Sequence, residues 1–221
     1  MSSLKQVFRA DGLAALALSK EVRLFALQHA CPGRTVLDLG CGTMPYRALF
    51  TVRGARYIGA DIDGDPDLLI GSDGSVPLAN GSVDAVVSFQ VLEHVKLVPA
   101  YLSTVRRVLR PGGRVFLSTH GVWPYHPHPT DFWRWTRDGL RLILEDAGFT
   151  IQKWTPICGP AAWIPMFPML ALHKAAGAAA PLLAPANLIV NALAWGADQL
   201  TPAAVRATNA AIFAADLSRG V

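Results

Sequence analysis

The chain has 221 residues, of which 52% are hydrophobic and 16% charged, and it carries a formal net charge of +4. This apolar composition excludes a disordered chain, and the absence of a dense Lys/Arg run argues against a nucleic-acid partner. Three scattered cysteines, Cys31, Cys41 and Cys158, form neither a disulfide framework nor a CxxC metal motif. We therefore expect a reducing compartment and predict a cytoplasmic protein.

Residues 1–34 are expected to form an N-terminal helical segment. Charged side chains interrupt its apolar residues, which is not typical of a signal peptide. The pattern predicts an amphipathic helix that ends near His29, since Pro32 and Gly33 follow. The interrupting charges are Lys5, Arg9, Asp11 and Lys20.

Strand and helix patterns then alternate along the chain. Short apolar and β-branched runs predict strands, and residues 91–109 and 136–147 are predicted to be helical. Alternation of this kind indicates a parallel sheet with helices on both faces. The predicted strands are residues 35–39, 56–60, 67–70, 83–89, 114–119, 149–154 and 208–215.

Two glycines, Gly40 and Gly42, follow the first predicted strand at once. Glycine at the carboxyl end of a strand lets a nucleotide-type ligand approach the backbone before a helix begins. An acidic residue about twenty positions later would hold ribose hydroxyls. Asp61 lies nineteen residues after Gly42, so the spacing predicts a cofactor that contains a ribose.

Four segments resemble motifs of the class I S-adenosylmethionine-dependent methyltransferases, in particular their small-molecule branch. The resemblance covers residues 35–149 well and residues 208–215 more loosely. It implies an α/β fold, a Rossmann-like seven-stranded methyltransferase sheet with helices on both faces and a helical insertion between strands six and seven. The segments are VLDLGCG (36–42), YIGADID (57–63), SDGSVPLANGSVDAVVSFQVLEHV (72–95) and LRPGGRVFLST (109–119).

The resemblance also implies S-adenosylmethionine as the cofactor and assigns its contacts residue by residue. Asp38, Gly40 and Gly42 would shape the methionine pocket. Asp61 would hold the ribose, and Gln90 would lie near the methionine. The full predicted cofactor-binding set is Asp38, Gly40, Cys41, Gly42, Asp61, Ile62, Asp73, Gly74 and Gln90, with Asp73 and Gly74 beside the adenine.

One position departs from the family pattern. The family often has a third glycine two residues after the second, and this chain has Met44 there, followed by Pro45. A dinucleotide fingerprint would need that glycine to admit a pyrophosphate. The departure argues against an NAD-dependent oxidoreductase and less against a cofactor without phosphate. A plain strand-to-helix turn is the alternative interpretation of the glycine pair.

Residues 125–136, YHPHPTDFWRWT, follow the fifth predicted strand and should lie at the edge of the sheet where ligands bind. Histidine is suited to proton transfer near neutral pH. We predict His126 and His128 as catalytic bases and Asp131 as the carboxylate that orients them. The same substrate wall would contain Arg134 for an anionic group and Trp133 or Trp135 for stacking.

Two other interpretations of this loop stay open. The two imidazoles and the carboxylate of Asp131 could bind a metal, although the resembling chemistry needs none and no metal is predicted. Alternatively, the prolines and tryptophans brace a rigid loop, and Asp131 caps the following helix or pairs with Arg134 or Arg137. Glu93 and His94 form a second candidate pair. Their role is either catalytic or structural, in contacts with the helix that they begin.

Residues 156–203 form an apolar insertion that we expect to be helical. Residues 175–197 carry no charged side chain, a length that could span a bilayer, but glycine, proline and asparagine interrupt the run. Asn187 and Asn191 lie four residues apart, and Asp198 continues near that face. The pattern therefore predicts an amphipathic helix rather than a transmembrane one.

The apolar side of that helix, with Leu188, Ile189 and Leu193, allows two interpretations. It packs on the sheet as a lid, or it forms a surface for a lipid-like substrate or a membrane. All six tryptophans lie between Trp123 and Trp195, on the acceptor half of the chain. This distribution favours the second interpretation.

These patterns predict an S-adenosylmethionine-dependent methyltransferase that acts by in-line methyl transfer on a small-molecule or lipid-like acceptor, with peripheral membrane contact in one interpretation. The alternative is a non-catalytic cofactor-binding or membrane-associated methyltransferase-like module. The predicted units are an N-terminal helical segment (1–34), a cofactor-binding core (35–155), the insertion (156–203), and the last strand with the tail (204–221).

Overall fold

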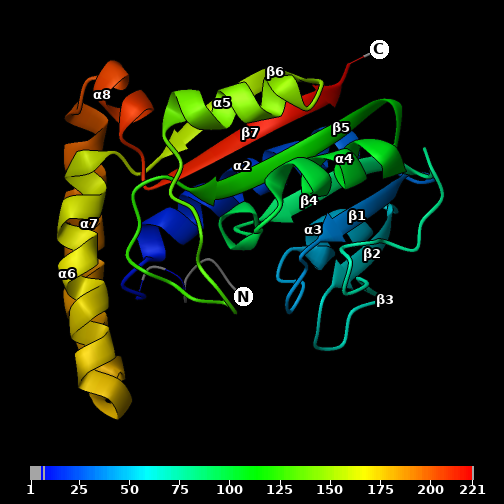
Figure 1. Ribbon diagram of the computed structural model, residues 1–221. Coiled ribbons are helices and arrows are strands. Elements are labelled where there is room, and N and C mark those ends of the chain that lie inside the picture. Colours follow the sequence, from blue (N-terminus) through cyan, green and yellow to red (C-terminus); the bar gives the residue numbers. More distant parts are fainter. Residues whose placement is uncertain (1–5, 7, 221) are drawn as a thin grey trace.

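The computed structural model describes residue 6 and residues 8–220, so part of the predicted N-terminal segment, Lys5 included, lies outside the described residues. A seven-stranded sheet forms its centre, with the order β3-β2-β1-β4-β5-β7-β6 (Figure 1). Strands β1 to β5 pair in parallel, and β7 pairs antiparallel with β5 and β6. The strands are β1 Thr35–Leu39, β2 Arg56–Asp61, β3 Leu68–Leu69, β4 Val83–Phe89, β5 Leu109–His120, β6 Phe149–Ile157 and β7 Ile212–Arg219. The predicted α/β class and strand number are confirmed.

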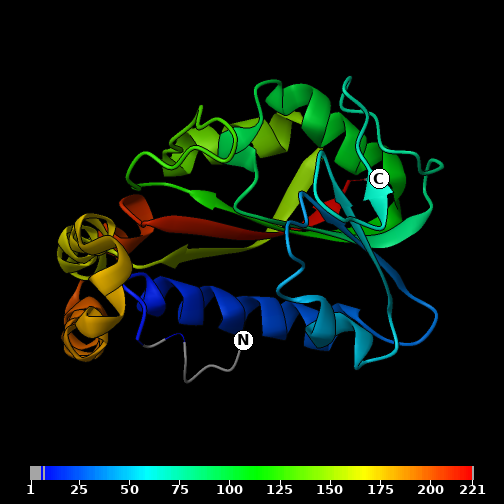
Figure 2. The same ribbon diagram turned by 90° about the horizontal axis from the view of Figure 1, so that it is seen from below.

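Helices cover both faces of the sheet. Helices α2 and α3 lie on one face, α4 and α5 lie on the other, and the pair α6 and α7 stands beside the end of the sheet (Figure 2). The helices are α2 Gly12–His29, α3 Arg47–Thr51, η1 Leu92–His94, α4 Val98–Val108, α5 Arg137–Asp146, α6 Pro160–Ala176, η2 Gly177–Leu183, α7 Ala184–Leu200 and α8 Ala203–Thr208.

The central strands contribute side chains to two hydrophobic cores, because successive side chains of a strand point to opposite faces of the sheet. Val36 of β1 belongs to the core that includes Val22 of α2. Its neighbour Leu37 belongs to the opposite core, with Leu102 of α4 and Leu140 of α5. All five side chains are buried, which explains why the central strands read as continuous apolar runs.

The predicted strands agree best with the structure at the centre of the sheet. Strands β1 and β4 begin and end as predicted, and β5 and β6 are longer than predicted. Strand β5 starts early because Leu109 pairs with Val83 before the register shifts to join Arg114 with Ala85. The predicted turn at residues 111–113 therefore lies inside the strand, where Gly112 adopts a positive φ of 73°.

Two predicted elements need correction. Residues 208–211 precede β7, so the predicted last strand starts four residues too early. The predicted helix at 91–109 is divided into η1 and α4. Pro99 lies in the first turn of α4, where its fixed φ suits a helix start and its missing N–H leaves no donor unpaired.

The insertion is helical, as predicted, and forms the hairpin α6–η2–α7. Its polarity is the reverse of a soluble amphipathic helix: Asn187 is 1% exposed, whereas Leu188 is 42% and Leu193 70% exposed. The lid interpretation, which would bury these leucines against the sheet, is wrong. The hairpin instead extends beyond the body of the protein (Figure 1).

The buried polar face of α7 attaches the hairpin to the chain before α2. Asn187 Nδ2 donates to the Phe8 carbonyl at 2.8 Å and to His173 Nε2 at 2.7 Å. Asn191 Nδ2 donates to the Arg9 carbonyl at 2.9 Å. These hydrogen bonds fix which side of α7 faces inward.

We predict unequal effects on stability for two neighbouring substitutions on α7. Asn187→Leu should lower the free energy of unfolding by roughly 1–3 kcal/mol, because the Phe8 carbonyl and the His173 ring lose the donor that the buried Asn187 supplies. Leu188→Asn, the matched control on the exposed side, should change it by no more than about 0.5 kcal/mol. Urea unfolding measures both values, and equal losses would contradict the inverted polarity.

Candidate functional site

The loop after β1 is folded back on β2. The backbone N–H groups of Gly40 and Cys41 both donate to the Ala60 carbonyl, at 2.8 Å and 3.1 Å. Gly40 has a φ of +81°, and a Cβ atom there would lie 2.5 Å from Val91 Cγ2. Glycine is therefore required at position 40 both for its backbone angle and for its lack of a side chain.

The backbone explains why a third glycine is common at the position of Met44. Met44 has a φ of +52°, in the left-handed region, which costs a residue with a side chain roughly 1–2 kcal/mol. Arg47 Nη1 donates to Met44 Sδ at 3.2 Å and ties the side chain to α3. The chain thus keeps the loop conformation without the glycine.

Asp61 closes the same loop from the end of β2. Its Oδ2 accepts the Gly42 N–H at 2.7 Å, and its Oδ1 accepts the Ile62 N–H at 2.7 Å. A carboxylate has about four lone-pair positions, so both oxygens keep capacity for further donors such as ribose hydroxyls.

Asp38 lies behind the loop and is fully buried. The Tyr57 hydroxyl donates to its Oδ2, while its Oδ1 has no hydrogen-bond partner in the described part of the chain. Burial raises the pKa of Asp38 to about 7, since a low-dielectric surrounding disfavours the charged form.

A cavity of about 1020 Å³ opens at the carboxyl edge of the sheet, large enough for a nucleoside cofactor together with part of an acceptor. Its walls include ten of the twelve predicted site residues. They are Gly40, Cys41, Gly42, Asp61, Ile62, Asp73, Gly74, Gln90, His126 and His128. The other two, Asp38 and Asp131, lie behind the walls.

Gln90 projects into this cavity from a strained backbone. Its φ is +57°, and it is held by two hydrogen bonds to Ser118: its N–H to the carbonyl at 2.9 Å and its Nε2 to Oγ at 3.0 Å. Its Oε1 is buried without a partner among the described residues. An unpaired acceptor in a cavity wall fits a ligand with N–H or O–H donors, as the methionine and ribose parts of S-adenosylmethionine have.

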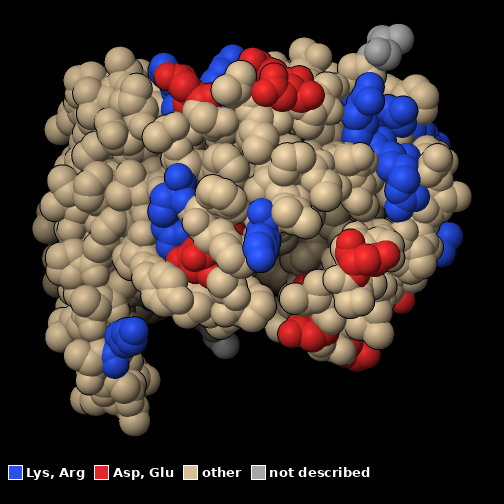
Figure 3. All heavy atoms as spheres, viewed as in Figure 1, with Lys and Arg blue, Asp and Glu red and all other residues tan. Residues whose placement is uncertain are grey.

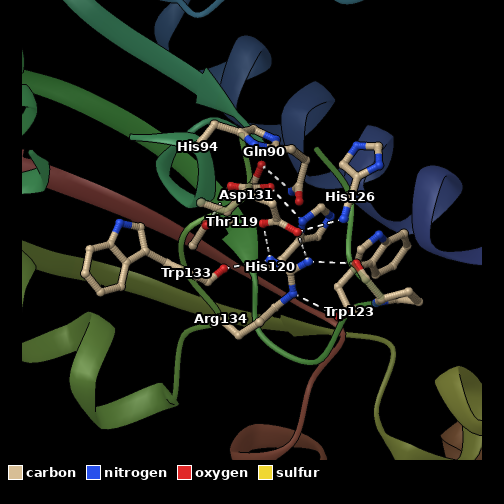
Figure 4. Close-up of polar contacts among 12 residues, drawn as sticks. Gln90, His94, Thr119, His120, Trp123, His126, Asp131, Trp133 and Arg134 are labelled. Atoms are coloured by element: carbon tan, nitrogen blue, oxygen red, sulfur yellow. Dashed lines mark hydrogen bonds and ion pairs between the residues drawn. The ribbon is translucent and has the colours of Figure 1, made fainter. Parts of the chain in front are cut away.

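Four imidazoles gather at the acceptor side of the cavity, from η1, the end of β5 and the loop that follows. Figure 4 shows three of them, His94, His120 and His126. The ring of His126 lies 5.8 Å from His94, 5.8 Å from His120 and 4.7 Å from His128. Burial and the neighbouring imidazoles lower the pKa of His126. A histidine in this setting is neutral near pH 7 and can accept a proton.

His120, which was not among the predicted site residues, forms a buried pair with Glu93. Nδ1 of His120 lies 2.7 Å from Glu93 Oε1, and Thr119 Oγ1 donates to Glu93 Oε2 at 2.8 Å. Burial would raise the pKa of Glu93, but its contacts with His120 and Thr119 lower it overall. The signal was available, because His120 directly follows the predicted fifth strand, at the edge where ligands bind.

Asp131 and Arg134 brace the loop. The carboxylate accepts the His126 N–H at 2.7 Å and is paired with Arg134, and Arg134 Nε also donates to the Trp123 carbonyl at 2.8 Å. Trp133 points away from the imidazoles in Figure 4, and its Nε1 donates to the Val95 carbonyl. The predicted pairing of Asp131 with Arg134 is confirmed, whereas the orienting contact with an imidazole stays a prediction.

The described residues contain no group of three or more His, Cys, Asp or Glu side chains placed to hold a metal ion.

Comparisons with known proteins agree with this geometry. A family model described as a methyltransferase domain matches residues 8–153. A protein of Mycolicibacterium smegmatis named "Probable S-adenosylmethionine-dependent methyltransferase" is 34% identical over 149 residues, 60% of this chain and 58% of that one. A malonyl-[acyl-carrier protein] O-methyltransferase of Serratia marcescens is 34% identical over 119 residues, 48% of this chain and 47% of that one.

The structural similarity extends further than the sequence similarity. The crystal structure of an S-adenosylmethionine-dependent methyltransferase from Mesorhizobium loti matches with a TM-score of 0.59 and 18% identity, and covers 96% of this chain and 100% of that one. At this identity the match concerns the fold. The chain spans about half the length of the curated relatives it matches.

The raised pKa of Asp38 predicts a pH-dependent stability. Because the folded chain binds this proton more tightly than the unfolded chain, the free energy of unfolding should fall as the pH rises from about 4 to about 7. Asp38→Asn retains an acceptor for Tyr57 and should remove this loss, on the order of a few kcal/mol at pH 8. Urea unfolding of both ligand-free proteins at pH 5 and pH 8 tests this, and parallel pH dependences would refute it.

Proposed function

Because the chain belongs to the class I S-adenosylmethionine-dependent methyltransferases, we propose that it transfers the methyl group of this cofactor to a small-molecule or lipid-like acceptor. One observation carries the proposal. A single cavity is lined both by the glycine loop with Asp61 and by His94, His126 and His128. A cofactor and an acceptor can therefore meet in it.

The cofactor end would use the groups that the fold leaves available. Asp61 would accept the ribose hydroxyls, and Gly40 and Gly42 would let the methionine part approach the backbone. Gln90 Oε1 would accept a hydrogen bond from the ligand, and Asp73 with Gly74 would border the adenine. When bound, the cofactor supplies an electrophilic methyl group on a sulfonium.

The acceptor end would supply alignment and a base. His126 lies in the cavity wall as a neutral imidazole, so it can take the proton of an acceptor hydroxyl or amine. His128 is the second candidate base. The pair Glu93–His120 and the brace Asp131–Arg134 would act as positioning groups, since both hold the segments from which the imidazoles project.

A lipid-like acceptor is supported by the surroundings of this loop. The ring of Trp123 stacks on His120 at 4.6 Å and contacts Phe167 of α6 at 5.8 Å. The acceptor loop is thus joined through aromatic rings to the apolar hairpin. One relative is named for an acceptor on acyl-carrier protein. Peripheral membrane contact belongs to the same proposal, because a bilayer would supply such an acceptor.

Asp61→Ala tests the cofactor site. The variant should bind S-adenosylhomocysteine roughly 1–3 kcal/mol more weakly, because hydroxyls buried in the site lose their acceptor. Asp65→Ala, an exposed acid in the loop that follows β2 and outside the cavity walls, is the matched control and should bind as wild type does. Titration calorimetry measures both, and unchanged binding by Asp61→Ala would remove this residue from the site.

His126→Asn tests the acceptor site. With a labelled methyl group on the cofactor and a cell lipid extract as acceptor source, transfer into the organic phase should fall by about 10²–10⁴-fold, the usual contribution of a general base. In wild type the rate should decline only below about pH 6.5, since the pKa of His126 is lowered from its ordinary value. The variant should lose that decline while keeping its affinity for S-adenosylhomocysteine. Cofactor binding without any transfer would favour the non-catalytic module.

A further inference from the structure

The hairpin α6–η2–α7 carries large apolar side chains on its outer surface. A water-soluble monomer gains nothing from such a surface, and contiguous exposed apolar areas mark interaction sites. The residues that define this outer face are Ile164 (57% exposed), Leu182 (81%), Leu188 (42%), Ile189 (60%), Leu193 (70%) and Trp195 (58%).

The outer face cannot turn inward without breaking the hydrogen bonds of the inner face. Asn187 and Asn191 attach the opposite side of α7 to the carbonyls of Phe8 and Arg9. Asp198, 8% exposed, continues that inner side toward the base of the hairpin. The exposure of the apolar side chains is therefore a fixed property of the fold.

The charge pattern indicates what covers the outer face. Between residues 160 and 197 the sequence contains one charged side chain, Lys174, and no acid. Lys174 is exposed in the last turn of α6, next to the η2 connection. In Figure 3 the surface over α6 and α7 is almost free of charge, unlike the rest of this face. A basic group at the end of an apolar surface is complementary to anionic lipid head groups.

The width of the outer face favours lipid over a second copy of the chain. At about 100° per residue, the exposed large residues of α7 span roughly 160° of its circumference, wider than the narrow seam of a coiled-coil pair. The exposed residues Ile164 on α6 and Leu182 on η2 extend the surface around the hairpin. Fluid acyl chains can cover such a curved surface, whereas a second protein would need a surface of complementary shape.

The length of the hairpin determines how it would sit. The stretch Pro160–Leu200 is the single helical segment, within the part of the chain that the structure describes, long and apolar enough to cross a membrane, and an 18-residue window of it has a mean hydropathy of 1.4. It is folded into two arms of 17 residues, each about 26 Å long, against a hydrocarbon thickness of about 30 Å. One leaflet is about half of that thickness, so each arm is too long to stand upright in it. With Asn187 and Asn191 fixed on the inner side, the arms would lie along the membrane surface with the outer face in one leaflet.

We propose that the outer face of α6–η2–α7 inserts into one leaflet of a bilayer that contains anionic lipids, as a peripheral anchor. The anchor packs against the acceptor loop through Phe167 and Trp123, so docking brings the cavity beside the membrane surface. This inference rests on the proposed function only for the acceptor, because docking itself needs neither cofactor nor turnover.

Vesicle flotation of the full chain tests the anchor. Wild type should rise with vesicles of phosphatidylcholine and phosphatidylglycerol, and less with phosphatidylcholine alone. Leu188→Asp with Leu193→Asp should abolish flotation at unchanged Tm and S-adenosylhomocysteine affinity. The matched control, Val52→Asp with Leu142→Asp, adds the same charge at exposed sites away from the hairpin and should float as wild type does. Lys174→Glu should remove the preference for phosphatidylglycerol.

A second measurement covers the case in which the double variant does not fold. Brominated acyl chains should quench the fluorescence of wild type, and Trp195→Phe should lose most of that quenching. Wild type that neither floats nor is quenched overturns the proposal. Sedimentation as a dimer that Leu188→Asp with Leu193→Asp dissociates, without flotation, would assign the face to a second copy. Cofactor binding and methyl transfer are measured separately, so their failure would leave vesicle binding interpretable.

Discussion

The reversal of strand order between β1 and β4 is the constraint on which the site depends. The chain builds the sheet outward from β1 to β3 on one side and then returns to place β4 on the other side of β1. The loops that leave these two strands diverge, and a crevice forms above them. Gly40 and Gly42 come from one loop and Gln90 from the other, so the cavity follows from the topology before any side chain is considered.

The same crevice demands unusual backbone at its walls. Met44 and Gln90, at φ +52° and +57°, occupy a region that residues with side chains rarely adopt. Each is held by its surroundings, Met44 by Arg47 and Gln90 by Ser118. Strain of this kind persists where the neighbouring structure over-determines it, and it is concentrated at binding sites. Two of the three described non-glycine residues with positive φ thus lie at the crevice, and the third, Cys158, directly follows β6.

Much of this arrangement could be predicted because it depends on local sequence. Strands β1 and β4 are buried on both faces, so their short continuous apolar runs predict central strands of a parallel sheet. The spacing from Gly42 to Asp61 reflects the length of one strand–helix–strand unit. The start of β7 could not be predicted, because the alanines near residue 210 suit a helix or a strand and pairing with β5 and β6 decides between them. The pair Glu93–His120 joins residues 27 positions apart through burial, which a local pattern does not contain.

The hairpin shows a further limit of sequence patterns, which is that they do not tell which face of a helix is buried. A helical period of 3.6 residues separates an apolar face from a polar one, but it does not say which face is turned inward. In a soluble protein, the polar face is usually turned to water and the apolar face is turned inward. In this chain, Asn187 and Asn191 of α7 donate hydrogen bonds to the backbone carbonyls of Phe8 and Arg9. The polar face is thereby buried, and the leucines are exposed on the outer face. Only an apolar environment such as a lipid leaflet would remove these side chains from water.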